Sequence, residues 1–158
     1  MEIVRRLLLV EDDENDAGLI LRSLQAQYPF VDVVHARDGQ ESIDFLAGAI
    51  QASEPETQPL PSLILLDLNI PKVSGFEVLH FLKSTEPLKT IPVVIFSSSD
   101  RDEDVLRAYH LGANGYLQKP IDFDKFETVV HETVHYWFKV NLVPMIRHSS
   151  ENAYRIRG

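Results

Sequence analysis

Acidic, hydroxyl and amino side chains occur at four separate points of this 158-residue chain, each at or just after the end of a mainly apolar run. The four segments are Glu11-Asp12-Asp13, Asp67 with Asn69, Ser97, and Lys119-Pro120. Carboxylates that are brought together repel one another unless a divalent cation neutralises them. Oxygen ligands with few imidazoles favour a hard ion, Mg²⁺, for which Mn²⁺ can substitute. If the fold unites these segments, the sequence predicts a magnesium site.

Asp67 is the candidate nucleophile of this set. A carboxylate beside Mg²⁺ and a lysine can attack phosphorus, because both cations offset the charge of the incoming phosphoryl oxygens. The expected product is an aspartyl phosphate. Taken alone, Asp67 would sooner be interpreted as a turn cap, since Asp is a common turn residue. The other three segments reverse that preference.

Five apolar segments are predicted to be strands. Leu63–Leu66 shows no polar alternation, as expected of a strand covered on both faces, and Pro92–Phe96 is rich in β-branched residues. In a parallel α/β sheet, ligands bind beyond the carboxyl ends of the strands, which is where all four segments would lie. The predicted strands are Leu7–Val10, Val31–His35, Leu63–Leu66, Pro92–Phe96 and Gly115–Leu117.

Amphipathic stretches between these strands predict five helices. For the fourth helix we expect Asp100 as N-cap, Glu103 as its capping-box partner and Gly112 at the end. Strands that alternate with helices indicate an α/β fold with a parallel sheet and helices on both faces, in one domain over residues 1–140. The helices are predicted to start near Asn15, Gln40, Gly75, Asp100 and Asp122.

Composition excludes several classes of protein. There is no cysteine, so neither a disulfide framework nor a thiolate metal site is available. The formal net charge of −9 argues against nucleic acid as a ligand. The apolar stretch near the start, Leu7–Val10, is too short for a signal peptide or a membrane span. We therefore expect a cytoplasmic protein.

Two segments depart from a minimal α/β plan. Residues 48–62 contain Pro55, Pro59 and Pro61 and are predicted to be an inserted surface loop. The segment after Trp137 is too apolar for a solvated extension. It could cover its own domain or serve as a dimer arm over residues 141–158, and these two alternatives stand about even.

Four motifs, in this order, resemble the receiver domain of two-component response regulators. The family fold implied is a flavodoxin-like, doubly wound five-stranded sheet in the order 2-1-3-4-5. The family also implies a cis peptide at Lys119-Pro120. The motifs are Val10-Glu11-Asp12, Leu66-Asp67-Leu68-Asn69-Ile70-Pro71 with Gly75, Phe96-Ser97, and Gly115-Tyr116-Leu117-Gln118-Lys119-Pro120.

The resemblance implies a role for each site residue. Asp67 would be the phosphoacceptor, and Ser97 and Lys119 would contact the phosphoryl oxygens. The metal would be bound by Asp12 directly, by Glu11 through water, by the backbone carbonyl of Asn69 and by Asp67. Ser97 and Tyr116 would form the conformational switch. Asp13 would be a loop residue or a helix cap.

The loop, the apolar tail and Leu111-Gly112-Ala113-Asn114-Gly115-Tyr116-Leu117 resemble single-domain regulators that partner phytochrome-type histidine kinases. This resemblance implies a signalling protein without an output domain, a sensor histidine kinase as phosphodonor, an unknown downstream protein and a homodimer. Phosphorylation would act through altered protein contacts.

Three alternatives to this function are weaker. His131-Glu132-Thr133-Val134-His135 is a literal HExxH zinc motif, but both His residues lie away from the predicted buried stripe of Phe126, Val130, Val134 and Trp137. Aspartyl phosphatases of the haloacid dehalogenase type carry a second acid where this chain has Asn69. A degenerate receiver that only binds partners would not need the complete set of acidic, hydroxyl and lysine residues.

Overall fold

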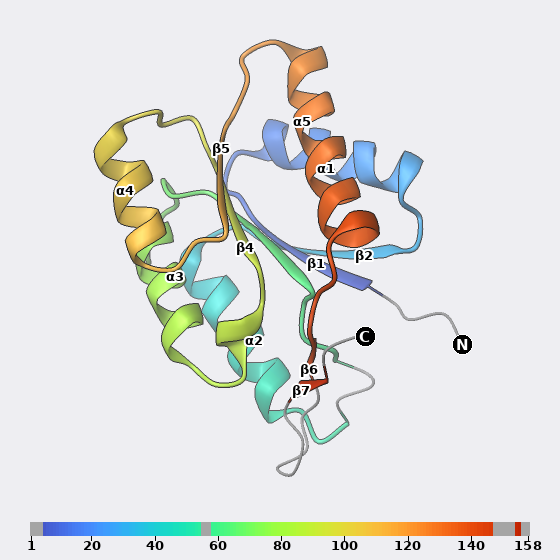
Figure 1. Ribbon diagram of the computed structural model, residues 1–158, viewed down its shortest axis with the longest axis vertical. Helices are drawn as coiled ribbons and strands as arrows, with labels where there is room; N and C mark the ends of the chain where they lie inside the picture. Colours follow the sequence, from blue (N-terminus) through green and yellow to red (C-terminus); the bar gives the residue numbers. More distant parts are fainter. Residues whose placement is uncertain (1–4, 55–57, 147–153, 156–158) are drawn as a thin grey trace.

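The computed structural model describes residues 5–54, 58–146 and 154–155, and its centre is one sheet of five parallel strands in the order β2-β1-β3-β4-β5 (Figure 1). This confirms the predicted flavodoxin-like, doubly wound topology. The strands are β1 (Arg5–Val10), β2 (Val31–Ala36), β3 (Leu63–Leu66), β4 (Val93–Ser97) and β5 (Gly115–Gln118). The helices are α1 (Glu14–Gln27), α2 (Gly39–Gln51), α3 (Gly75–Ser84), α4 (Asp102–His110) and α5 (Phe123–His135).

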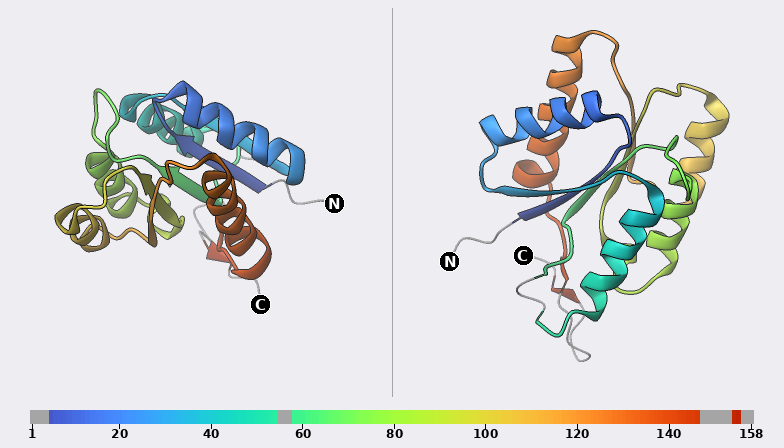
Figure 2. Two further views of the ribbon diagram at one scale, coloured as in Figure 1. Left: turned by 90° about the horizontal axis from the view of Figure 1, so that it is seen from above. Right: turned by 180° about the vertical axis from the view of Figure 1, so that it is seen from behind.

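Helices cover both faces of the sheet, as the two further views show (Figure 2). Successive residues of a strand point to opposite faces, so the apolar runs of β1 and β3 supply two cores. Leu8 and Val10 pack with α2, α3 and α4 on one face. Leu7 and Leu9 pack with α1 and α5 on the other face. Continuous apolar strands are therefore explained by burial on both sides.

The register of the strands aligns their carboxyl ends. Val10 of β1 pairs with Leu66 of β3, and the backbone N–H of Asp67 donates to the carbonyl of Val10 at 3.0 Å. At the other side of β4, Ser97 pairs with Gln118 of β5, and the N–H of Lys119 donates to the Ser97 carbonyl at 2.7 Å. The residue that follows each strand thus reaches the same edge.

A close approach at Gly75 anchors the loop between β3 and α3. A Cβ atom at Gly75 would lie 2.3 Å from the carbonyl oxygen of Asp67 and 2.5 Å from the Cα of Leu68. Ser74 and Glu77 form a capping box at the start of α3, so the helix begins at this contact. The loop that carries Asp67 is therefore held directly against the first turn of α3.

Helix α4 starts later than predicted, and its expected capping box is wrong. The helix begins at Asp102, its N-cap is Arg101, and Arg101 makes no side-chain cap bond. Glu103 pairs instead with the guanidinium of Arg101 at 2.9 Å. The side chain that ties this turn to the preceding loop is Ser99, whose hydroxyl donates to Asp104 at 2.6 Å.

The chain after α5 continues as a π-helical segment, η2 (Tyr136–Val140), which shifts the buried stripe by one residue. The N–H of Asn141 donates to the carbonyl of Tyr136, five residues back, at 2.6 Å. As a result Phe138 is 3% exposed and belongs to the core, whereas Trp137, predicted to be buried, is partly exposed. The first part of the apolar tail therefore covers its own domain.

Three other expectations are corrected or limited by the structure. Helix α2 extends to Gln51, so the predicted loop at 48–62 begins as helix, and Leu60 within it is buried in the core. The cis peptide in the described chain is at Glu86-Pro87 and not at Lys119-Pro120, since a proline motif alone does not determine the isomer. Beyond η2, β6 (Met145–Ile146) pairs antiparallel with β7 (Tyr154–Arg155), and the rest of the predicted arm, 147–153 and 156–158, lies outside the described residues.

Candidate functional site

Three carboxylates meet at the carboxyl edge of the sheet. Glu11 and Asp12 follow β1 and Asp67 follows β3, and one oxygen of each lies within 4.8 Å of the others. Among the described residues, these three carboxylates are the one group of three or more His, Cys, Asp or Glu side chains close enough to hold a metal ion. Glu11 and Asp67 are buried, whereas Asp12 is exposed. The hard oxygen donors and the open position of Asp12 fit a divalent cation of the Mg²⁺ or Mn²⁺ class.

The ammonium of Lys119 lies against the buried side of this cluster. Its Nζ atom is 2.6 Å from Glu11 Oε2, 3.0 Å from Asp67 Oδ2 and 2.9 Å from Asp16 Oδ2. The Lys119 side chain is only 9% exposed, so water screens these contacts weakly. The site thus already contains one cation that offsets part of the carboxylate charge.

Burial and neighbouring charges shift the pKa values of Glu11 and Lys119. Burial raises the pKa of Glu11 to about 7, the hydrogen bond from Lys119 opposes this, and the charge of Asp67 adds to it. For Lys119, burial would lower the pKa, but the hydrogen bond to Glu11 and the charges of Asp67 and Glu11 outweigh it and raise the pKa. Lys119 therefore stays protonated as a fixed positive charge.

The loop after β3 and the end of β4 complete the edge. The backbone N–H of Asn69 donates to Asp67 Oδ1 at 3.2 Å, which holds one oxygen of that carboxylate while Lys119 contacts the other. Ser97 is fully buried at the end of β4, and its hydroxyl accepts from the N–H of Ser99 at 3.3 Å. The hydroxyl, the carboxylate and the amine lie at the ends of adjacent strands.

Tyr116 connects β5 to the loop that precedes α4. Its hydroxyl donates to the carbonyl of Ser99 at 2.8 Å, and Ser99 in turn contacts both Ser97 and Asp104. Burial raises the pKa of Tyr116, although its hydrogen-bonding partners Ser99 and Ser97 oppose the shift. A continuous set of hydrogen bonds therefore runs from the end of β4 to the start of α4 and to β5.

Sequence reasoning missed Asp16 as a member of this cluster. Asp16 lies in the first turn of α1, which Asp13 caps by accepting from the Asp16 N–H at 2.9 Å. The predicted helix included Asp16, but no strand end pointed to it. The one available signal was the spacing of four residues from Asp12, about one helical turn beyond the acidic pair.

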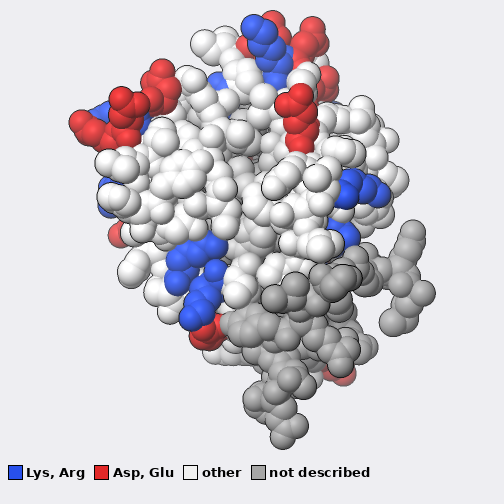
Figure 3. All heavy atoms as spheres, in the orientation of Figure 1, with Lys and Arg blue, Asp and Glu red and all other residues white. Residues whose placement is uncertain are grey.

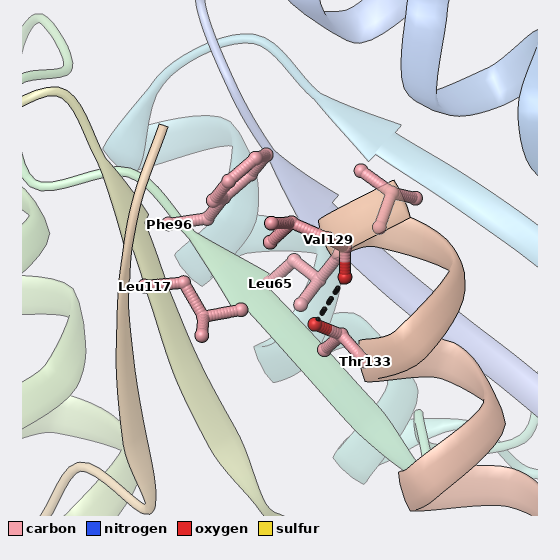
Figure 4. A pocket seen from close by; sticks show the side chains of 6 residues that line it. Leu65, Phe96, Leu117, Val129 and Thr133 are labelled. Atoms are coloured by element: carbon pink, nitrogen blue, oxygen red, sulfur yellow. Dashed lines mark hydrogen bonds between the residues drawn. The ribbon is translucent and has the colours of Figure 1, made fainter. Parts of the chain in front are cut away.

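The HExxH segment does not form a metal site in the described chain. His131 packs its ring against Tyr28 with centroids 5.9 Å apart, and neither His131 nor His135 belongs to the acidic group at the sheet edge. A separate hollow lies between α5 and the sheet (Figure 4), where the hydroxyl of Thr133 donates to the Val129 carbonyl at 2.7 Å. Its lining is otherwise apolar, with Leu65, Phe96 and Leu117 among the contributors. Neither feature provides an alternative centre for chemistry.

None of the helices within the described ranges is both long and apolar enough to cross a membrane.

Comparison with known proteins identifies the family. Residues 7–131 match the model of the response regulator receiver domain. The chain is 38% identical over 138 residues to the "Probable methanogenesis regulatory protein FilR2" of Methanothrix harundinacea, and the aligned region covers 87% of this chain and 86% of FilR2. It is 36% identical over 138 residues to Response regulator Rcp1 of Synechocystis sp., and the aligned region covers 87% of this chain and 92% of Rcp1.

Solved structures agree with this result. The phosphorylated cyanobacterial phytochrome response regulator RcpA superposes with a TM-score of 0.82 at 34% identity, covering 90% of this chain and 99% of RcpA. The Mn²⁺-bound form of Rcp1 gives a TM-score of 0.80 at 35% identity, covering 89% of this chain and 99% of Rcp1. The chain therefore belongs to the response regulator receiver-domain family, whose members are phosphoacceptor signalling proteins rather than classical enzymes.

Proposed function

We propose that this chain accepts a phosphoryl group on Asp67 from the phosphohistidine of a sensor histidine kinase. An oxygen of the Asp67 carboxylate bonds to phosphorus as the phosphorus–nitrogen bond breaks, and the released imidazole takes up a proton. The observation that carries the proposal is the position of Asp67, held by the Asn69 N–H and by Lys119 beside two further carboxylates. Kinases of phytochrome type are the proposed donors, because RcpA is a phytochrome response regulator.

Glu11, Asp12, Asp67 and the backbone carbonyl of Asn69 would hold Mg²⁺, with Mn²⁺ as a substitute. The bound cation supplies positive charge that offsets the phosphoryl oxygens. The Mn²⁺-bound form of Rcp1 supports a divalent cation in a close relative, and the three clustered carboxylates support it in this chain. Lys119, which contacts Glu11 and Asp67, would offset further charge, and the Ser97 hydroxyl would donate to a phosphoryl oxygen.

Ser97 and Tyr116 form the proposed switch. A Ser97 hydroxyl that turns to a phosphoryl oxygen gives up its contact with the Ser99 N–H, and Ser99 carries the carbonyl that accepts from Tyr116. A change at Asp67 would therefore alter the loop before α4 and the position of the tyrosine. The signal would reach a downstream protein through the changed surface of α4, β5 and α5.

The proposed organisation is a receiver domain over residues 1–140, with a cytoplasmic location and homodimer formation through residues 141–158. The experiment that tests the function is incubation with Mg²⁺ and a small phosphodonor, followed by intact-mass analysis. We expect one added phosphoryl group on the wild type, and no addition on Asp67→Asn or when a chelator is present. Equal labelling of the wild type and Asp67→Asn would contradict the proposal.

The choice of kinase needs its own comparison, because FilR2 is at least as similar in sequence as Rcp1. Phosphoryl transfer from a phytochrome-type kinase should exceed transfer from an unrelated histidine kinase at equal concentrations. Equal transfer from both would remove the phytochrome link and leave the role of Asp67 in place.

A further inference from the structure

The three donors of the Lys119 ammonium are shared among three carboxylates. A lysine ammonium has three N–H groups, and the oxygens of Glu11, Asp16 and Asp67 lie within 2.6 to 3.0 Å of Nζ. Glu11 and Asp67 also belong to the group that could hold a metal ion, whereas Asp16 does not. Asp16 is therefore a partner of Lys119 that has no second task at this edge.

Two successive hydrogen bonds connect the backbone of Asp16 to Glu11 through the loop before α1. The Asp16 N–H donates to the capping side chain of Asp13 at 2.9 Å, and the Asp13 N–H donates to Glu11 Oε1 at 3.0 Å. The Asp16 side chain is 28% exposed, between the buried lysine and solvent. The first turn of α1 thus presents a carboxylate to Lys119 at a position set by the same loop that carries Glu11 and Asp12.

We propose that Asp16 is a positioning residue for phosphoryl transfer. It holds the Lys119 ammonium toward Asp67 when the oxygens of Glu11 and Asp67 bind the metal ion or the phosphoryl group. This inference rests on the proposed function. If Lys119 lost those two partners without Asp16, its long side chain would regain rotamer freedom, and a misplaced charge stabilises a transition state poorly. Asp16 keeps one N–H bonded and directs the remaining two toward the reacting oxygens.

If Asp16 acted only through its charge, its effect on the rate of phosphorylation would be the opposite of that expected from positioning. A carboxylate near the site repels an anionic phosphodonor, so its removal alone would speed the reaction. Asp16→Asn keeps an oxygen that can accept from Lys119, whereas Asp16→Ala keeps none. Positioning therefore predicts a slow Ala variant and rescue by Asn, and repulsion predicts that both variants are faster than the wild type.

The test measures the initial rate of phosphorylation by acetyl phosphate with saturating Mg²⁺, using intact mass. Glu14→Ala is the matched control, because Glu14 is an exposed acid of the same helical turn. We expect Asp16→Ala to lower the rate roughly tenfold, and Asp16→Asn and Glu14→Ala to stay within about twofold of the wild type. Mg²⁺ affinity should change little in all three variants, and thermal unfolding checks that each one is folded.

An Ala variant as fast as Glu14→Ala, or an Asn variant as slow as the Ala variant, would overturn the inference. If the Ala variant does not fold, the Asn variant alone decides: a rate tenfold below that of the wild type, or more than twofold above it, also overturns the inference. These outcomes differ from failure of the proposed function, in which the wild type itself gains no phosphoryl group.

Discussion

Among the residues of this site, replacement of Lys119 should have the most direct effect on the stability of the protein. Its side chain is 9% exposed between Glu11 and Asp67, which are themselves buried. Removing one partner of a buried ion pair costs about 3–5 kcal/mol, because the other charge is left uncompensated. We therefore expect Lys119→Met to lower the free energy of unfolding by about 3 kcal/mol without metal, and by clearly less with Mg²⁺, whose charge replaces the ammonium.

Urea unfolding with and without Mg²⁺ measures both quantities. Lys125→Met is the control, since Lys125 is an exposed lysine at the start of α5 and should change stability by no more than about 0.5 kcal/mol. Equal losses for the two lysine variants would show that the buried cation does not balance these carboxylates. A Lys119→Met loss unaffected by Mg²⁺ would show that the metal does not replace the charge of the ammonium.

For single residues of the site, the sequence predicts the places of some side chains far better than those of others. Glu11 and Asp67 follow apolar runs, and parallel strands in register must bring such residues to one edge, so their neighbourhood was predictable. The side chain of Asp16 lies on a helix, and where it points depends on how α1 is rotated and tilted on the sheet. No local pattern in the sequence contains that information, although the cap at Asp13 was predictable.

The contact between α3 and the loop after β3 gives a test at the scale of elements. Ala at position 75 would place its Cβ 2.3 Å from the Asp67 carbonyl oxygen, so the loop or the helix must move. We expect Gly75→Ala to destabilise the protein by about 2–3 kcal/mol. It should also slow phosphorylation, because Asp67 moves with the loop.

Gly48→Ala is the matched control. Gly48 is exposed in α2, and nothing lies within 4 Å of a Cβ built there. Ala favours a helix over Gly by about 0.5–1 kcal/mol, so this variant should be slightly stabilised. Urea unfolding measures both variants, and a Gly75→Ala protein as stable as Gly48→Ala would contradict the close approach.

Lys83 joins α3 to the segments before β4 and β5, and it should make stability depend on pH. Its Nζ donates to the carbonyl of Ile91 at 2.9 Å and to Asn114 Oδ1 at 3.0 Å. Burial lowers the pKa of Lys83 from 10.5 to about 8. Between these two values the unfolded chain binds a proton that the folded chain lacks, so the free energy of unfolding rises with pH across that window.

Lys83→Met removes this dependence and serves as the reference. From about pH 7.5 to about pH 10, the stability of the wild type relative to Lys83→Met should increase, because the cost of a buried ammonium is relieved as the group loses its proton. Urea unfolding at both pH values gives the difference. A wild type and a variant whose stabilities change in parallel would show that Lys83 titrates normally.

The elements themselves were predictable where periodicity is strong and less so at their ends. All five strands and five helices were expected, because burial on both faces or on one stripe leaves a clear pattern. The start of α4 was misplaced because Ser99, outside the helix, bonds Asp104 in place of a capping box. The exposure of Trp137 was missed because a π-helical segment changes the residue-to-residue rotation that a regular helix would keep.

At the scale of the whole molecule, charged and uncharged side chains are separated on the face that Figure 3 shows. Acidic side chains gather at the upper left of Figure 3, over α4, and much of the face between α4 and α5 carries no charged side chain. The first turn of α4 contains Asp102, Glu103 and Asp104. After α5, Tyr136, Val140 and Leu142 are 48%, 60% and 64% exposed. Such an apolar surface next to a buried Phe138 suits contact with a second copy.

We expect the protein to sediment as a dimer and the double variant Val140→Lys with Leu142→Lys to sediment as a monomer, because two charges would be buried without partners. Leu106→Lys is the control, since Leu106 is equally exposed on α4 at 59%. Dissociation by the α4 variant alone would place the interface on the other face, and a wild-type monomer at all concentrations would remove the dimer arm.

The position of the phosphoryl group tests directly whether Asp67 is the acceptor. The protein is phosphorylated with Mg²⁺ and a small phosphodonor, reduced with borohydride, which converts an aspartyl phosphate to homoserine, and digested for peptide mass analysis. We predict homoserine at position 67 and at no other aspartate. Homoserine at position 12 or 13 instead, or an unmodified Asp67 in protein that has gained the phosphoryl mass, would show that Asp67 is not the acceptor.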